Sequence, residues 1–222
     1  DGGDQVPHGA FVVSLDKGSK KDTVPTVLLW KVEPGDPSQP GSVEVDIRGK
    51  LTAEDNGLDD RTSNVALSAK ATILATAGGA RVTLYKVDEP DTWDGVGALE
   101  RAIVLGGEVT ALTFSPAPLG KIGTGDEKTS VLMLASAAAD NTVRLSAVNE
   151  STLKMQTLYV FDFDEYARSL AFSADGHTFG IQRAKELCLL DVKDWYSTVT
   201  PEDEEEEEEG DSSSLEMNDD DS

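Results

Sequence analysis

The sequence predicts an all-β fold made of repeated units, and three observations support this prediction. Fourteen short runs of β-branched and aliphatic residues are bounded by Gly, Pro, Asp, Asn and Ser, as strands are by turns. No segment of comparable length carries an apolar period of 3.6 residues with helix caps. Four runs end in an x-Val pair, and the closing residues Val32, Val87, Val148 and Val192 are separated by 55, 61 and 44 residues. Such self-similarity indicates a repeat architecture.

The predicted strands fall into units of up to four. The first strand of a unit ends in an apolar residue followed by Ser, and a small apolar second strand comes after a turn. A tight turn containing Gly78-Gly79 or Asp140-Asn141 leads into the Val-closed third strand, because Gly, Asn and Asp tolerate left-handed backbone. In chain order the strands are Ala10–Leu15, Thr26–Val32, Ser42–Ile47, Val65–Ala69, Thr72–Ala77, Arg81–Val87, Arg101–Leu105, Val109–Ser115, Val131–Ala137, Thr142–Val148, Thr157–Phe163, Ala167–Ser173, His177–Gln182 and Glu186–Val192.

This pattern resembles WD40 repeats over roughly residues 10–195, most clearly in residues 109–116 and 134–145. In that family an Asp at the site of Asp140 orders the turn between the second and third strands, and it usually bonds to a His, a Ser or Thr, and a Trp. Ser136 and Asp140 match this structural turn, whereas Gly106-Gly107 replaces the usual Gly-His pair. The Trp position of the successive repeats holds Trp30, Tyr85, Ser146 and Leu190. The resemblance thus implies a β-propeller whose polar tetrad is incomplete.

The units hold three, four, four and three strands, so the series starts at a second strand and ends at a third. We therefore expect about four WD40-like blades within residues 1–196, the first and last incomplete. In propellers, a last blade of three strands is completed by a strand from elsewhere in the chain. The expected architecture is the C-terminal half of a larger propeller, and a closed four-bladed ring is the alternative.

Charge divides the chain into two parts. The net charge is −23, and Glu202–Ser222 holds 13 acidic and no basic residues. Residues 197–222 are predicted to form a disordered acidic tail, because like charges repel and little apolar surface is present. Glu204, Glu205 and Glu206 in this tail are candidates for contacting a basic partner. Ser213, three residues before Glu216, is a candidate for phosphorylation. Direct binding of nucleic acid is disfavoured, since it requires clustered Lys and Arg.

Catalytic and metal-binding patterns do not stand out in the sequence. Cys188 is the single cysteine, and it lies in an apolar run where a small buried hydrophobe is expected. His8 and His177 stand alone, and no Cys/His spacing suits zinc. The glycines of residues 120–125 lack the Gly-Lys-Ser/Thr of a phosphate loop. We expect no enzyme activity, no cofactor and no membrane span, and an intracellular location in the cytoplasm or nucleus.

The predicted function is that of a non-catalytic scaffold for protein–protein interaction. It would present propeller loops and the top face to partners within a larger complex, and Arg81, Arg144 and Arg168 are candidates for contacting acidic or phosphorylated peptides. Two alternatives remain open. One is an acidic-tailed chaperone or assembly factor for basic proteins such as histones or ribosomal proteins, and the other is a structural subunit of a coat or pore complex.

Overall fold

The computed structural model describes residues 10–17, 25–36, 38–39, 42–52, 58, 61–87, 100–122 and 129–192. These residues form fifteen strands in four antiparallel sheets. Sheet 1 is β1 (Ala10–Asp16), β2 (Thr26–Pro34) and β3 (Val43–Leu51). Sheet 2 is β4 (Thr62–Leu67), β5 (Ile73–Gly78), β6 (Arg81–Lys86) and β7 (Glu100–Val104). Sheet 3 is β8 (Val109–Phe114), β10 (Thr129–Ala138), β11 (Thr142–Asn149) and β12 (Met155–Asp162), with β9 (Gly120–Ile122) added beside β10. Sheet 4 is β13 (Ser169–Phe172), β14 (Thr178–Gln182) and β15 (Leu187–Asp191).

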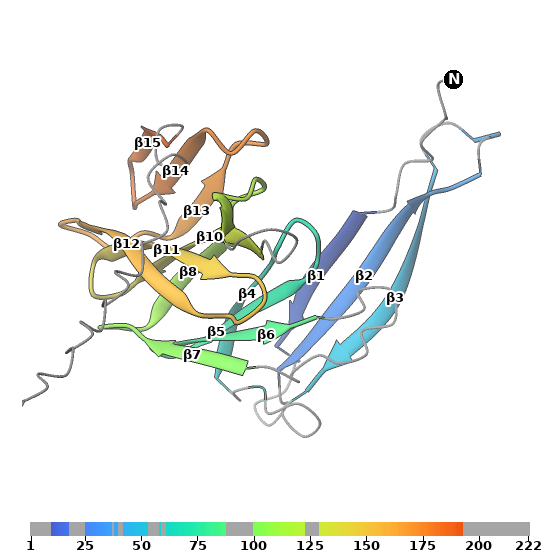
Figure 1. Cartoon of the computed structure of the whole chain (residues 1–222), viewed down its shortest axis with the longest axis horizontal. Helices are drawn as coiled ribbons and strands as arrows, with labels where there is room; N and C mark the ends of the chain where they lie inside the picture. Colours follow the sequence, from blue (N-terminus) through green and yellow to red (C-terminus); the bar gives the residue numbers. More distant parts are fainter. Residues whose placement is uncertain are drawn as a thin grey trace, which may run out of the picture.

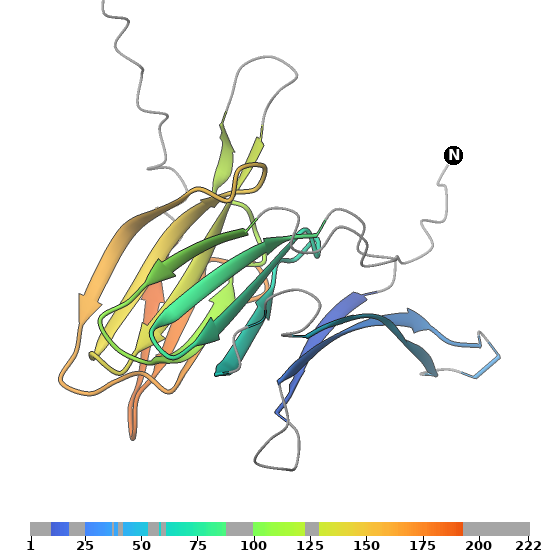
Figure 2. The same cartoon turned by 90° about the horizontal axis from the view of Figure 1, so that it is seen from below.

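The sheets form a fan that follows the order of the chain. Figure 1 shows sheet 1 at one end of the fan, sheet 4 at the other, and the outer strands β3, β7, β12 and β15 at the periphery. The view from below in Figure 2 shows the strands of sheet 1, in blue, on one side of the molecule and the other three sheets together on the other side. The first strands of successive sheets lie against one another, β1 against β4, β4 against β8 and β8 against β13. The inner strands therefore line the centre of the fan, as expected for propeller blades.

The prediction of an all-β fold is confirmed, and sheets 1, 2 and 4 have the three, four and three strands expected of them, whereas sheet 3 has five. The two predicted tight turns are confirmed as well, since Gly79 and Asn141 both have positive φ. The prediction missed β9, a three-residue strand that pairs with the start of β10 and extends that hairpin. It also ended the third strand at Ile47, whereas β3 continues to Leu51 past a bulge opposite Leu29 and Trp30. Leu51 is fully buried there, although Arg48 and Lys50 beside it gave that segment the composition of a loop.

Three apolar clusters join neighbouring sheets. The side chains of sheets 2 and 3 point alternately to two different clusters. In β5, Leu74 packs toward sheet 1 while Ile73 and Ala75 pack toward sheet 3. In β10, Leu134 packs toward sheet 2 and Met133 toward sheet 4. Each inner sheet thus has two buried faces, which explains why its strands are continuous apolar runs without polar alternation.

Truncating a side chain between sheets 2 and 3 tests this packing. Leu134 is buried in β10 within the cluster that those two sheets share. We expect Leu134→Ala to lower the free energy of unfolding by about 2–5 kcal/mol, measured by denaturant titration with circular dichroism. Val104→Ala, at an exposed position on β7, is the matched control and should change it by less than about 0.5 kcal/mol. Equal effects of the two substitutions would contradict the packing of the sheets.

Candidate functional site

Several connections gather on one side of the fan, here called the loop face and defined by residues 79–80, 105–108, 139–141, 163–168 and 183–186. Backbone hydrogen bonds tie these segments to one another. Leu105 donates to the carbonyl of Ala80, Ala139 to that of Glu108, and Phe163 to that of Asn141. The connections on this face are therefore fixed to one another and provide a rigid frame for exposed side chains.

The loop face contains an open pocket of about 540 Å³ at the ends of the inner strands. All four sheets contribute to it. Its rim carries the exposed charges of Lys17, Glu108 and Arg168, and the ring of Tyr166 is also exposed. The lining residues are Lys17, Ser63, Asn64, Glu108, Val109, Thr110, Ala139, Tyr166 and Arg168.

Two side chains hold the inner strands together beside this pocket. The Asn64 amide donates a hydrogen bond of 3.0 Å to the carbonyl of Val109 and so joins β4 to β8. The Thr110 hydroxyl donates a hydrogen bond of 2.6 Å to the carbonyl of Ala167 and so joins β8 to the start of sheet 4. Neither residue could be identified from the sequence, because a polar side chain at the start of an apolar strand does not indicate which group it bonds in the next sheet.

The three predicted arginines lie in different surroundings. Arg168 lines the pocket, with its guanidinium 5.8 Å from the centre of the Tyr166 ring, and its backbone amide donates to the carbonyl of Gln182. Arg144 lies at the start of β11, and its guanidinium is 3.7 Å from the carboxylate of Asp140. Arg81 lies at the start of β6 and hydrogen-bonds to Thr83. The structure therefore places Arg168 in the pocket, and neither Arg81 nor Arg144 lines it.

Asp140 orders the turn between β10 and β11, although the residues that hold it differ from those expected of the family. Its carboxylate accepts hydrogen bonds from the Thr142 amide at 3.0 Å and the Thr142 hydroxyl at 2.7 Å. A Cβ on Gly106 would lie 2.3 Å from the Asp140 carboxylate, and a Cβ on Gly107 would lie 2.7 Å from the Asp140 backbone nitrogen. The Gly106-Gly107 pair thus permits a close approach that other residues would block. Ser136 is buried in β10, opposite Leu112 and Arg144.

The surroundings of Asp140 favour its charged form. Partial burial acts to raise the pKa of Asp140, but the hydrogen bonds from Thr142, the positive charge of Arg144 and the hydrogen bond from the Gly106 amide outweigh it. The pKa of this carboxyl therefore lies below its ordinary value. The ionised carboxylate is the form that stabilises the turn.

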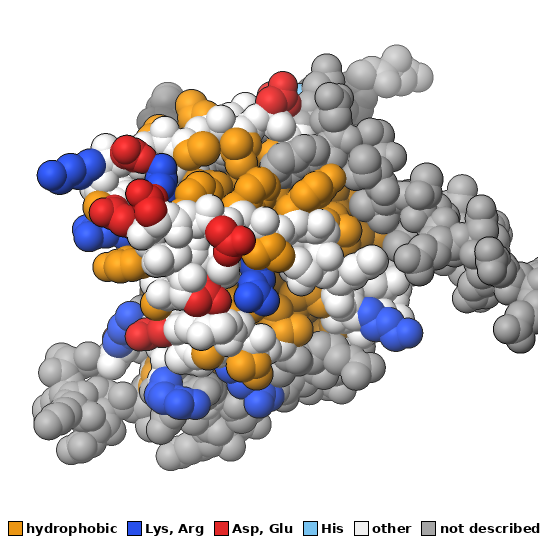
Figure 3. Space-filling model, turned by 90° about the vertical axis from the view of Figure 1, so that its left-hand side faces the viewer, with side chains coloured by type: hydrophobic (Ala, Val, Ile, Leu, Met, Phe, Trp, Pro, Cys, Tyr) orange, Lys and Arg blue, Asp and Glu red, His pale blue; other side chains and the backbone are white. Residues whose placement is uncertain are grey.

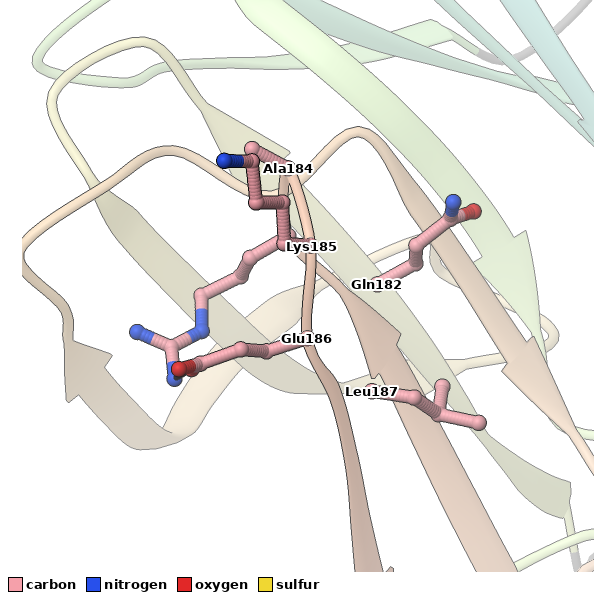
Figure 4. A pocket seen from close by; sticks show the side chains of 6 residues that line it. Gln182, Ala184, Lys185, Glu186 and Leu187 are labelled. Atoms are coloured by element: carbon pink, nitrogen blue, oxygen red, sulfur yellow. Dashed lines mark hydrogen bonds and ion pairs between the residues drawn. The ribbon is translucent and has the colours of Figure 1, made fainter.

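A second pocket, of about 350 Å³, lies at the β14–β15 turn (Figure 4). Two of its charged groups, Arg183 and Glu186, pair with each other. The Arg183 guanidinium hydrogen-bonds to Asp164 at 2.6 Å and to Glu186, and it lies 4.9 Å from the centre of the Phe163 ring. These contacts join the β14–β15 turn to the connection that leads into sheet 4. Arg183 and Glu186 therefore serve to hold the scaffold together.

The His, Cys and acidic residues named in the sequence analysis lie in separate parts of the described structure or outside it. No cluster of three or more His, Cys, Asp or Glu residues is placed in the described part of the chain to hold a metal ion. His177 is exposed, and its amide donates to the Asp175 carboxylate in the turn before β14. Cys188 is partly buried and packs against the core between sheets 3 and 4.

The described residues include no helix long and apolar enough to cross a membrane. Glu204, Glu205, Glu206 and Ser213 lie outside the described residues.

Comparison with known proteins supports the fold. No protein-family model matches the chain, and no curated protein matches it. Sqt1 of Saccharomyces cerevisiae is similar in structure, with a TM-score of 0.52 and 15% sequence identity over 82% of this chain and 41% of that chain. A chain of the mitotic checkpoint complex matches with a TM-score of 0.45 and 17% identity over 75% of this chain and 43% of that chain. The chain spans less than half the length of either. The expected WD40-like β-propeller fold is thus confirmed.

The Asp140 turn leads to a pH-dependent prediction. Because its pKa is lowered in the folded state, the Asp140 carboxylate contributes stability above its unfolded pKa of about 3.9. This contribution is lost as the pH falls through the folded value. We expect Asp140→Asn to lower the free energy of unfolding by about 1–3 kcal/mol near neutral pH and by less at about pH 3, measured by urea titration. Glu165→Gln, at an exposed position, is the control. A pH-independent difference between Asp140→Asn and the wild type would contradict this account.

Proposed function

We propose that the chain is a non-catalytic scaffold that binds a protein partner in the loop-face pocket. The observation that carries the proposal is the pocket itself, which four packed sheets frame and which presents Arg168, Lys17 and Tyr166 to solvent. Rigid β scaffolds commonly bind partners through their loops.

The chemistry of the rim favours an acidic or phosphorylated segment of the partner. Arg168 offers a planar set of donors suited to carboxylate or phosphate, and Lys17 adds a second positive charge at the same pocket. Tyr166 supplies apolar area beside the guanidinium, and Tyr and Arg are residue types enriched where binding energy concentrates. Glu108 lies on the same rim and would favour a segment that also carries a donor.

Reversing the charge at the pocket tests the proposal. We expect Arg168→Glu to weaken binding of the native partner by about tenfold or more, equivalent to about 1.4 kcal/mol, because an attraction becomes a repulsion. Affinity purification with quantitative mass spectrometry would identify the partner, and calorimetry with the purified pair would measure the affinity. Lys154→Glu, at an exposed position before β12 and away from the pocket-lining residues, makes the same charge change and should leave binding unaltered. A loss of binding in both variants, or in neither, would contradict the assignment of this pocket.

The charge of the chain favours a second candidate, an assembly factor for basic proteins. The net charge of −23 and the 13 acidic residues of Glu202–Ser222 would attract a Lys- and Arg-rich partner. Such binding would be strongest at low salt, since mobile ions screen exposed charges.

Deleting Glu202–Ser222 separates the two candidates. If the tail captures a basic partner, the deletion should weaken binding to a Lys-rich protein by about tenfold or more at low salt, and by less as salt rises. Arg168→Glu should leave that binding unchanged. Unaltered affinity of the truncated chain for basic proteins would remove the assembly-factor proposal and leave the loop-face proposal intact.

A further inference from the structure

An apolar hollow lies between sheets 2 and 3 on the side of the fan away from the loop face, where β10 begins. Its volume is about 30 Å³, about that of one water molecule in the liquid, so it admits the end of one slender side chain. Leu132 is buried there in the cluster that sheets 2 and 3 share, and Pro116 and Pro118 are exposed. The residues that form this opposite hollow include Ala69, Lys70, Pro116, Pro118, Leu132 and Glu150.

The turns around the opposite hollow are held in a fixed shape. Ala71 and Leu153 have φ of 56° and 54°, a backbone that is costly for residues other than glycine and persists only where the surroundings enforce it. Both residues are fully buried. Glu150 is held at two points, because its carboxylate accepts a hydrogen bond from the Thr72 hydroxyl and its backbone carbonyl accepts one of 2.7 Å from Lys86. The hollow is therefore formed before any ligand binds.

Three lysines surround the opposite hollow. Lys70 lines it, the Lys86 ammonium bonds to the backbone of Glu150, and Lys154 lies in the same β11–β12 turn as Glu150. The residues that the structure describes hold as many Lys and Arg as Asp and Glu, and Figure 3 shows the two kinds interspersed on one side of the molecule. The net charge of −23 is thus carried by the rest of the chain, and the described sheets do not repel an acidic segment.

One segment outside the described residues matches both the hollow and its lysines. Residues 202–222 hold 13 acidic and no basic residues, and Leu215 and Met217 are their only large apolar side chains. These two residues flank Glu216, and further acidic residues lie on both sides of them within residues 211–221. The segment 211–221 thus combines two apolar anchors with negative charge, which is complementary to an apolar hollow among lysines.

The chain leads into this segment from a point close to the hollow. Val192, the last described residue, is buried in the cluster between sheets 3 and 4 together with Leu119 and Val131. Pro118 and Ser130, their neighbours in the sequence, line the hollow. Val192 and the hollow are therefore on the two faces of one sheet, and packed sheets lie about 10 Å apart. The roughly 20 residues that lead from Val192 to the segment span up to about 60 Å when extended, which is more than enough.

We propose that residues 211–221 bind to the opposite hollow of the same chain. The unbranched end of Met217 enters the hollow, Leu215 packs on Pro116 and Pro118, and the acidic neighbours face the three lysines. Because the segment is tethered, its effective concentration at the hollow is on the order of millimolar, so a weak contact is sufficient. The proposal is independent of both proposed functions, since it involves neither the loop-face pocket nor a partner protein.

Methyl NMR of the full chain tests the proposal. The chain has three methionines, so labelling their methyl groups gives few signals, and the Met217 signal is the one lost in Met217→Leu. We expect its chemical shift to differ from that in a synthetic peptide of residues 202–222, with cross-peaks to Leu132. Dilution should leave the shift unchanged, because the contact lies within one chain. A signal that matches the peptide would overturn the proposal, and one that changes on dilution would overturn binding within the same chain.

Two substitutions test the contacts themselves. Leu215→Ser removes an apolar anchor and Lys70→Glu reverses a charge at the hollow, so each should lower the equilibrium constant for docking by about fivefold or more and move the Met217 signal toward its position in the peptide. Lys185→Glu, at an exposed position on the loop face, makes the same charge change and should leave the signal in place. Circular dichroism would verify that the variants are folded. Equal movements of the signal in Lys70→Glu and Lys185→Glu, or none in either, would contradict docking at this hollow.

Discussion

The rest of the structure depends on the packing of sheets that are apolar on both faces. In β5 and β10, neighbouring side chains enter different clusters, as Leu74 and Ile73 do. Burying one such side chain contributes about 1.5–3 kcal/mol, whereas an exposed ion pair contributes about 0–1 kcal/mol. The stack of sheets is therefore the main source of stability, and ion pairs such as Arg183 with Asp164 chiefly fix the position of connections. Small residues such as Ala75 and Ala135 on the central strands bring the sheets close together.

The position of the loop face follows from this packing. Because β4, β8 and β13 lie side by side, the Asn64 amide reaches Val109 and the Thr110 hydroxyl reaches Ala167. These bonds satisfy polar groups at the inner ends of the sheets, where an unpaired group would cost about 1–3 kcal/mol. The pocket opens beside them, so its rim is held by the same bonds that join the sheets. The contacts that hold the fold together therefore also fix the shape of the pocket.

The sequence predicted those parts of the structure that depend on local patterns of residue type. Strand composition, the Val-closed repeat and the turns at Gly79 and Asn141 were sufficient to predict the four sheets and their order along the chain. Contacts between sheets produce no local residue pattern, so the hydrogen bonds of Asn64 and Thr110 could not be predicted. The pairing of β9 with β10 is local, but three residues are too few to show an alternating pattern. Arg168 was predicted as one of three equivalent arginines, and only the structure separates it from Arg144, which lies beside Asp140.

The origin of the pocket residues connects the fold to the proposed binding. Lys17 directly follows β1 of sheet 1, Asn64 lies in sheet 2, Thr110 lies in sheet 3, and Arg168 directly precedes β13 of sheet 4. The pocket therefore exists only while all four sheets are packed in their native order. A partner that binds there interacts with the folded stack and not with separated sheets, so its binding free energy adds to the stability of the whole stack. At a concentration of about one hundred times its Kd, this linkage amounts to about 2.7 kcal/mol, comparable to burying one large aliphatic side chain between two sheets. Partner binding and the folding equilibrium of the four-sheet stack are therefore thermodynamically linked.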